Sequence, residues 1–400
     1  MFSRHTAWTP EVGPIARALA TLTRGEILDL TVSNPTTAGL TYPPTLYRNL
    51  CDERSATYEP ASLGLASARE AVAAYYARRG QTPDPADIGI CASSSEAYAY
   101  LLGLLCDPGD AVLVPQPGYP LLRMLAELAH VELVPYPLLF DGAWSIDLDG
   151  VAQILAATPR ARALVVVAPN NPTGNYLAPH ELAALDALLA PRAIALLVDE
   201  VFWDYPLTTT PRPSPTLTPP ACLSFVISGL SKIAALPQLK LAWWLALGPS
   251  SLVREATARL ELIADTYLSA ATPVQLALPD LLAAAPDMQA QISRRTHLNL
   301  GRLRRACLDT AMTVLAVDAG WTALLRMPAV LDHPDGDDIG WALALLTRGH
   351  LLTQPGQLYD LHDPPHLALS LLTPEPIFAA ACDRLPGLVA EVLASGPCSR

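Results

Sequence analysis

The chain has 400 residues, of which 51% are hydrophobic, and its formal net charge at pH 7 is −12. This length and apolar content predict a large buried core divided between two domains, and the acidic balance leaves no basic patch for a nucleic acid or an acidic membrane surface. Seven cysteines without metal-type spacing are typical of reduced thiols in a cytoplasmic protein, and we expect no metal site, no signal peptide and no membrane span.

Short apolar runs alternate along the chain with longer helical patterns rich in Ala and Leu. Strands are predicted at residues 88–92, 111–115, 131–136, 163–168, 193–198, 223–227 and 241–247. Helices are predicted between them at residues 66–79, 95–106, 120–128, 148–158 and 179–189. Strands that are apolar throughout and alternate with helices indicate an α/β fold, with a mostly parallel central sheet and helices on both faces.

The character of the sequence changes after Gly248. One long helical stretch is predicted over residues 253–308, followed by strands at 314–317, 322–327 and 367–372 and by helices at 338–347 and 377–394. We therefore expect a large α/β domain over residues 40–270. Residues 1–39 and 271–400 are expected to form a smaller α+β domain.

Lysine is rare in this chain: Lys and Arg together number 26, and only Lys232 and Lys240 are lysines. An amine can lose its proton and attack a carbonyl carbon, whereas a guanidinium stays charged. Lys232 ends the run 223–232, in which an apolar stretch stops at small residues. A chance lysine on a surface turn is the plainer explanation, but the position after a buried strand favours a chemical role.

Polar residues follow three other predicted strands at their carboxyl ends, where an open parallel sheet binds its ligands. Three serines, residues 93–95, open a helix and suit a phosphate group, although a simple serine N-cap has the same sequence. The string 169–174, Pro-Asn-Asn-Pro-Thr-Gly, predicts a rigid turn with its amides held outward. Asp199 ends a fully apolar strand, where a buried acid needs a cation nearby.

An amine, an acid, amides and a phosphate site are together the groups that pyridoxal phosphate requires. The cofactor needs a lysine for its Schiff base and an acid at the ring nitrogen, so that the ring withdraws electrons. It also needs a donor for the ring oxygen and a site for its phosphate. The sequence offers a candidate for each.

On these motifs the chain resembles the class I and II aminotransferases of the aspartate aminotransferase superfamily, which have fold type I, and the resemblance covers nearly its whole length. It implies a pyridoxal 5′-phosphate enzyme in which Lys232 forms the Schiff base and moves the substrate proton, while Asp199 contacts the ring nitrogen. Tyr119, within Pro117-Gly-Tyr-Pro, is implied as the catalytic aromatic that stacks on the ring, and Asn171 as the donor to the ring oxygen. The residues implied around the phosphate and the Schiff base are Ser94, Ser95, Ser231, Lys240 and Tyr58.

The resemblance also implies a homodimer with shared active sites. Tyr58 resembles the tyrosine that reaches the phosphate of the neighbouring subunit, and residues 265–272 resemble a segment that completes the neighbouring site. On its residues alone, Tyr58 is equally a surface aromatic and Tyr119 a packed loop residue. Both functional roles therefore depend on their register with the stronger motifs.

Three positions depart from the family pattern. Phe202 stands where a tyrosine usually donates to the ring oxygen, and Lys240 where an arginine usually binds the phosphate. Ala368 stands where an arginine usually clamps the substrate α-carboxylate, and the loss of such a buried pair is costly for binding. We expect this clamp to be replaced by His366, which is on the same strand face, or by Asn34 in the segment 33–35, with Asn171 also contacting the substrate. A substrate amine without an α-carboxylate is the alternative.

These residues predict an aminotransferase that moves an amino group from an amino acid to a 2-oxo acid. β-Elimination, cyclisation or decarboxylation on the same scaffold begins from the same Schiff base, and the absent arginine at Ala368 increases the weight of these alternatives. A non-catalytic regulatory module is a third reading. It is disfavoured because no basic or helix-turn-helix segment is found at the N-terminus.

Overall fold

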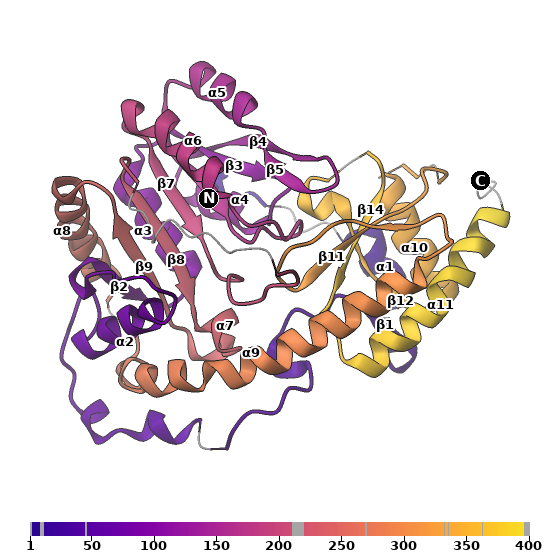
Figure 1. The fold of residues 1–400 in the computed structure, drawn as a ribbon, viewed down its shortest axis with the longest axis horizontal. Helices are drawn as coiled ribbons and strands as arrows, with labels where there is room; N and C mark the ends of the chain where they lie inside the picture. The colour runs from indigo at the N-terminus through magenta and orange to yellow at the C-terminus, as the bar shows by residue number, and fades with distance from the viewer. Residues whose placement is uncertain are drawn as a thin grey trace.

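The computed structural model describes residues 2–8, 12–44, 46–209, 220–268, 270–331, 333–334, 336–361 and 363–395. Two bodies lie side by side, and Figure 1 shows the long helix α9 (Thr272–Ala306) running from the larger body into the smaller one. The active-site candidates of the sequence lie mainly on the larger body.

An eight-stranded sheet forms the centre of the larger body. Its strands lie in the order β2 (Ile88–Cys91), β9 (Ala242–Leu247), β8 (Ser224–Gly229), β7 (Ala195–Asp199), β6 (Ala161–Val167), β3 (Ala111–Gln116), β4 (Glu132–Phe140) and β5 (Trp144–Ile146). The five strands from β8 to β4 are parallel, and β9 and β5 run antiparallel to their neighbours. The predicted α/β fold with a mostly parallel sheet is therefore confirmed.

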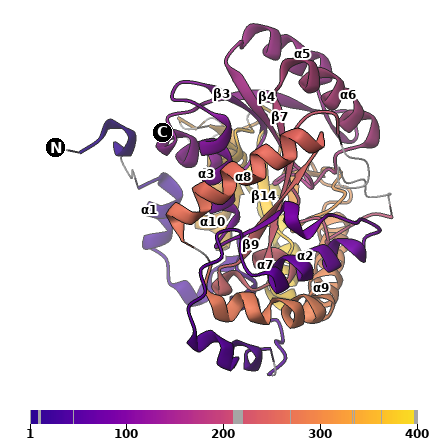
Figure 2. The ribbon, with the colours of Figure 1, turned by 90° about the vertical axis from the view of Figure 1, so that its left-hand side faces the viewer.

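Helices cover both faces of this sheet. One core is formed with α2 (Ala66–Ala77), α5 (Leu148–Ala157), α6 (Pro179–Leu189) and the first half of α9. The other is formed with α3 (Ser94–Leu105), α4 (Leu121–Leu128) and α8 (Ser250–Tyr267). In Figure 2, α3 and α8 lie to the left of α2, α5 and α6. Successive strand residues alternate between the cores: Val226 belongs to the first, and Phe225 and Ile227 belong to the second.

The smaller body is α+β, as expected. Its antiparallel sheet consists of β10 (Thr313–Val314), β11 (Thr322–Arg326), β14 (His366–Ser370) and β13 (Gln354–Pro355), and its core is closed by α10 (Asp337–Gly349) and α11 (Glu375–Ala394). The N-terminal segment joins this body, because β1 (Leu28–Asp29) pairs in parallel with β12 (Leu351–Leu352) and α1 (Pro14–Ala20) lies against α10.

The single helix predicted over residues 253–308 is wrong. The chain forms α8 and α9 and changes direction at Leu268, whose φ is 66°. The Ala- and Leu-rich pattern continues through this break, so periodicity alone does not reveal it. Leu278 of α9 packs in the core of the larger body and Leu303 in that of the smaller one, and the proposed domain boundary near residue 270 therefore stays a prediction.

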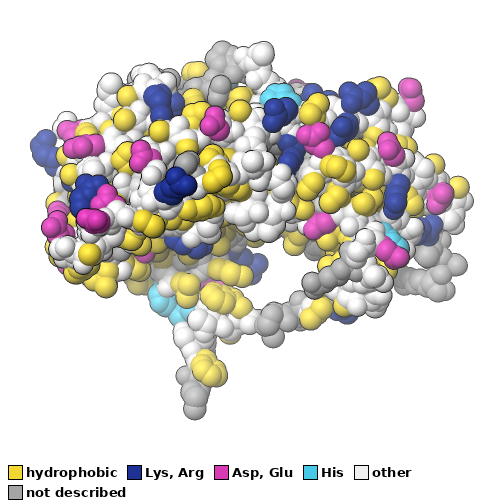
Figure 3. Space-filling view, turned by 90° about the horizontal axis from the view of Figure 1, so that it is seen from below, with side chains coloured by type: hydrophobic (Ala, Val, Ile, Leu, Met, Phe, Trp, Pro, Cys, Tyr) yellow, Lys and Arg dark blue, Asp and Glu magenta, His cyan; other side chains and the backbone are white. Residues whose placement is uncertain are grey.

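The surface carries charges of both signs, and they are interspersed on the face drawn in Figure 3. Among the described residues, no helix is long and apolar enough to cross a membrane. The six cysteines in the described part of the chain are free thiols, and Cys398 lies outside the described residues.

Candidate active site

Lys232 lies in α7 (Leu230–Ile233), which follows the carboxyl end of β8 directly. Its half-buried amine lies 4.8 Å from the ring centroid of Trp321 and 5.4 Å from that of Phe202. Burial lowers the pKa of this amine to about 8, although the charge of Asp199 opposes the shift. At neutral pH such a lysine has a larger unprotonated fraction than an exposed one, which is the form that attacks a carbonyl carbon.

Asp199 ends β7, the strand beside β8, and its side chain is held in one orientation. The Tyr98 hydroxyl of α3 donates to its Oδ2 at 3.1 Å, and the backbone N–H of Val201 donates to its Oδ1 at 3.0 Å. Burial raises the pKa of this carboxyl to about 6, while the two hydrogen bonds and the charge of Lys232 favour the ionised form. The site thus brings together an oriented acid at the end of β7 and an amine just beyond the end of the neighbouring strand β8.

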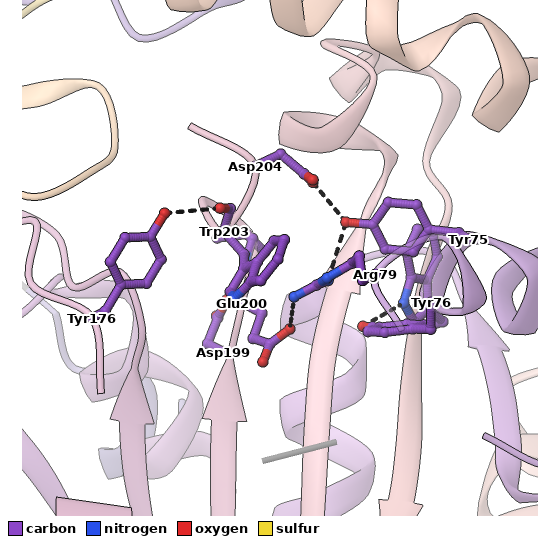
Figure 4. A network of polar contacts seen from close by, with 10 residues as sticks. Tyr75, Tyr76, Arg79, Tyr176, Asp199, Glu200, Trp203 and Asp204 are labelled. Atoms are coloured by element: carbon purple, nitrogen blue, oxygen red, sulfur yellow. Dashed lines mark hydrogen bonds and ion pairs between the residues drawn. The ribbon is translucent and has the colours of Figure 1, made fainter. Parts of the chain in front are cut away.

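The second acid after β7, Glu200, belongs to a separate buried network (Figure 4). Its Oε2 accepts from Nη2 of Arg79 at 2.7 Å, and the guanidinium carbon of Arg79 lies 3.3 Å from the ring centroid of Trp203. The Tyr75 hydroxyl donates to Oδ2 of Asp204 at 2.6 Å and accepts from Arg79 at 3.2 Å. This network ties the segment after β7 to the C-terminal end of α2 and so supports the acid beside it.

The two asparagines of the turn after β6 have different roles. Asn170 is 3% exposed, and its Nδ2 donates to the carbonyl of Pro117 at 3.1 Å and to Oγ1 of Thr173 at 2.7 Å. Asn170 therefore holds the turn against the loop after β3. Asn171 is half-buried and lines a narrow cavity together with Phe202, Trp321 and Thr322.

Tyr119 lies in the loop after β3, which is the neighbour of β6 in the sheet. From these two strands the chain continues in opposite directions across the sheet, and such a switch point is where doubly wound sheets bind their ligands. The Tyr119 side chain is 52% exposed. The N–H of Gly118 donates to the carbonyl of Tyr359 at 3.1 Å, so this loop also contacts the smaller body.

Three segments converge beside Lys232 at the start of α3. Ala242, at the start of β9, lies opposite both Cys91 and Gly229 in the sheet register. A Cβ atom at Gly229 would lie 2.8 Å from the Cβ of Ala242, so the close approach of the strands requires glycine there. The exposed Lys240 precedes β9 at this same end of the sheet.

The start of α3 provides donors for an anion. Ser93 caps the helix, because its Oγ accepts from the N–H of Glu96 at 3.1 Å, and the Glu96 side chain accepts in turn from the N–H of Ala92. Among the described residues, the backbone N–H groups of Ser94 and Ser95 have no acceptor. The N-cap function is therefore performed by Ser93, and the next two residues remain available to a phosphate group.

Other predicted positions are not brought to Lys232 by any described contact. Tyr58 is 68% exposed, and Asn34 is exposed with its Oδ1 bonded to the N–H of Thr36 at 3.0 Å. His366 is 4% exposed at the start of β14, opposite Arg326. Their roles at the cofactor or the substrate stay predictions.

The position of the absent arginine is occupied by a packed apolar cluster. Ala368 is 1% exposed and packs with Leu315, Leu324, Tyr359 and Leu361. The substrate side of this strand therefore presents no cation at residue 368.

Several residues of the site were missed from the sequence. Tyr98 was signalled only by its place one turn after the serines of α3. Trp321 and Thr322 follow Gly320 at the start of a short strand, and no periodicity marks them. Arg79 lies just beyond α2 and reads as an ordinary surface charge.

A half-buried amine just beyond one parallel strand and an oriented acid at the end of the neighbouring strand, together with N–H groups at the start of α3 that have no acceptor among the described residues, define a site that fits pyridoxal phosphate on a fold type I scaffold. The comparisons with known proteins agree. The family model "Aminotransferase class I and II" matches residues 26–384, and the chain belongs to this family. Members of the family use pyridoxal phosphate, and the resemblance inferred from the motifs is confirmed.

Individual relatives are similar over most of the chain. Tyrosine aminotransferase of Mus musculus is 28% identical over 375 residues, which are 90% of this chain and 80% of that protein. Glutamate-pyruvate aminotransferase AlaA of Escherichia coli (strain K12) is 28% identical over 283 residues, which are 68% of this chain and 67% of that protein.

Solved structures share the fold. Alanine aminotransferase from Pyrococcus furiosus superposes with a TM-score of 0.82 at 24% identity, covering 94% of this chain and 95% of that chain. A single mutant of Thermus thermophilus aspartate aminotransferase superposes with a TM-score of 0.82 at 22% identity, covering 97% of this chain and 99% of that chain. The chain is therefore an aminotransferase, and these relatives lend no support to the lyase, cyclase or decarboxylase alternatives.

Proposed function

We propose that the chain transfers an amino group from an amino acid to a 2-oxo acid with pyridoxal 5′-phosphate bound covalently to Lys232. The observation that carries this proposal is the position of the Lys232 amine, whose pKa is lowered to about 8, just beyond the end of β8, while the oriented carboxylate of Asp199 ends the neighbouring strand β7. When bound, the cofactor withdraws electrons from the carbon that bears the amino group. Lys232 would take the proton from that carbon and deliver it to the carbon of the cofactor that holds the nitrogen, so that the amino group stays on the cofactor and passes to the 2-oxo acid by the reverse transfer.

The remaining residues hold the cofactor. Asp199 pairs with the ring nitrogen, and Tyr98 keeps its carboxylate turned toward that atom. Tyr119 covers the ring face, and Asn171 donates to the ring oxygen. The phosphate is held at the start of α3 by the N–H groups and hydroxyls of Ser94 and Ser95. Ser231, Lys240 and, from a partner subunit, Tyr58 complete the phosphate site.

The substrate carboxylate needs a partner other than residue 368, because Ala368 lies in an apolar cluster. We propose that His366 or Asn34, together with Asn171, holds it by hydrogen bonds. His366→Ala and Asn34→Ala are expected to raise KM for the amino donor, whereas the exposed His297→Ala serves as the matched control. If neither variant changes KM, the carboxylate is held elsewhere or the substrate lacks one.

The assembly and location of the enzyme are also proposals. A homodimer in the cytoplasm fits the exposed Tyr58, whose side chain makes no hydrogen bond among the described residues, and the free thiols of the described cysteines. Analytical ultracentrifugation of the purified protein tests the dimer, and a monomer with full activity would contradict it.

The reaction is tested by product stoichiometry. The protein loaded with pyridoxal phosphate is incubated with a panel of amino acids and 2-oxo acids, and both products are quantified. One new amino acid per new 2-oxo acid, formed only when an acceptor is present, is the expected result. Release of ammonia or carbon dioxide without an acceptor would instead establish elimination or decarboxylation.

A further inference from the structure

A hydrogen bond connects the two bodies at the edge of the cofactor site. Thr322, the first residue of β11, donates from Oγ1 to Oδ1 of Asn171 at 3.2 Å. The two residues are far apart in the sequence, and they line the same narrow cavity with Phe202 and Trp321. Phe202 and Trp321 also lie beside the amine of Lys232, with their ring centroids at 5.4 and 4.8 Å.

The hydrogen bond decides which way the Asn171 amide points. A primary amide has one acceptor atom and one donor group on opposite sides, so engaging the oxygen directs the nitrogen away from Thr322. Among the described residues, the nitrogen of Asn171 has no acceptor, in contrast to that of Asn170, which donates once within its turn and once to the loop after β3. The Asn171 nitrogen is therefore a free donor with a fixed direction.

The orientation matters more here because a second donor is absent. Phe202 lines the cavity but has no hydroxyl, so it cannot share the hydrogen bond to a ring oxygen. A single amide that rotates freely would present its oxygen to the ligand part of the time, which repels another oxygen. With the Asn171 amide held in one orientation, a single donor can keep the hydrogen bond to the ring oxygen that two donors would otherwise share.

Thr322 is itself held in place. The N–H of Gly320 donates to the carbonyl of Tyr205 at 2.8 Å, and the N–H of Ala319 donates to the carbonyl of Gly174 at 2.9 Å. A Cβ at Gly174 would lie 2.5 Å from the carbonyl oxygen of Ala319, so the turn and this segment are in direct contact. These contacts fix the segment before β11 on the turn that carries the asparagine.

We propose that Thr322 is a positioning residue, which orients the Asn171 amide so that its nitrogen donates to the ring hydroxyl oxygen of the cofactor. The inference rests on the proposed function, in which Asn171 contacts that oxygen. It assigns a role to a residue of the smaller body that touches no reacting atom.

The test compares the affinity of the cofactor-free protein for two probes: pyridoxal 5′-phosphate and its analogue without the ring hydroxyl. Thr322→Val removes the hydroxyl at nearly constant size, and Thr322→Ser is the control that keeps it. Thr322→Val is expected to raise the dissociation constant for pyridoxal phosphate about 3- to 10-fold, as for the loss of one hydrogen bond, and to leave that of the analogue within about twofold. Thr322→Ser is expected to bind both probes like the wild type.

A double variant separates positioning from a general structural effect. Asn171→Ala should weaken binding of pyridoxal phosphate, and adding Thr322→Val should weaken it no further, because the two residues act through one contact. Additive losses, equal losses for both probes, or an unchanged Thr322→Val would overturn the inference. Thr322→Ala is the substitute if the valine variant does not fold. If Asn171→Ala itself binds pyridoxal phosphate like the wild type, the proposed cofactor contact fails instead.

Discussion

The guanidinium of Arg79 and the carboxylate of Glu200 form an ion pair 2.7 Å long, and the exposed fractions of the two side chains are 6% and 1%. Trp203 covers the guanidinium at 3.3 Å, and the pair lies beside the acid that we assign to the cofactor. Because a buried charge left without its partner is poorly solvated, the pair is a strong test of how the site is supported.

Arg79→Met is expected to lower the free energy of unfolding by about 3–5 kcal/mol, since it breaks the buried ion pair with Glu200. Denaturant unfolding measures this loss. The double variant Arg79→Met/Glu200→Gln should lose less than the sum of the single changes. Arg259→Met removes an ion pair whose side chains are 65% and 58% exposed and should cost no more than about 1 kcal/mol. Equal losses for the two arginine variants would contradict this account.

Gly229→Ala is expected to destabilise the protein by about 1–3 kcal/mol, because the added methyl group would overlap Ala242. The φ of Gly229 is 178°, which is extended backbone open to any residue, so the effect comes from contact alone. Gly103→Ala in α3, where a Cβ meets no atom within 4 Å, is the control and should be neutral or stabilising. Thermal unfolding of both variants measures the two effects. An unchanged unfolding midpoint for Gly229→Ala would contradict the predicted overlap with Ala242.

The pKa of Asp199 gives a pH dependence to the stability of the cofactor-free protein. Burial raises this pKa from 3.8 to about 6, so the folded chain binds the proton more tightly than the unfolded one. Protonated Asp199 therefore contributes its full stabilisation below about pH 4. As the pH rises through 6, this contribution to the free energy of unfolding falls by about 3 kcal/mol at most. The difference in unfolding free energy between wild type and Asp199→Asn should therefore shift against the wild type from pH 4 to 7. A difference that does not change with pH would argue against a raised pKa.

Much of the larger body could be predicted from the sequence, since its strands are apolar throughout and alternate with helices. Lys232, Asp199 and the serines of α3 were found because each stands at the carboxyl end of such a strand. The rule that parallel sheets bind ligands at this edge then brings them together without knowledge of any contact.

The remaining features depend on contacts between distant segments. The break at Leu268 lies inside an unbroken helical pattern, and the bond from Thr322 to Asn171 joins two bodies whose docking no local pattern specifies. The role of Glu200 likewise required its partner Arg79 on another element. From the sequence alone, Asp199 and Glu200 at the end of β7 are equivalent candidates for the site acid. The buried ion pair of Glu200 with Arg79 is what distinguishes their roles.

The central claim is that Lys232 bonds the cofactor. The most direct measurement is borohydride reduction of the protein loaded with pyridoxal phosphate, followed by mass spectrometry of its peptides. The account predicts one cofactor mass on the peptide that contains Lys232, and none in Lys232→Ala, while Lys240→Ala still carries it. A reduced cofactor on another residue, or one that persists on the protein in Lys232→Ala, would contradict the assignment.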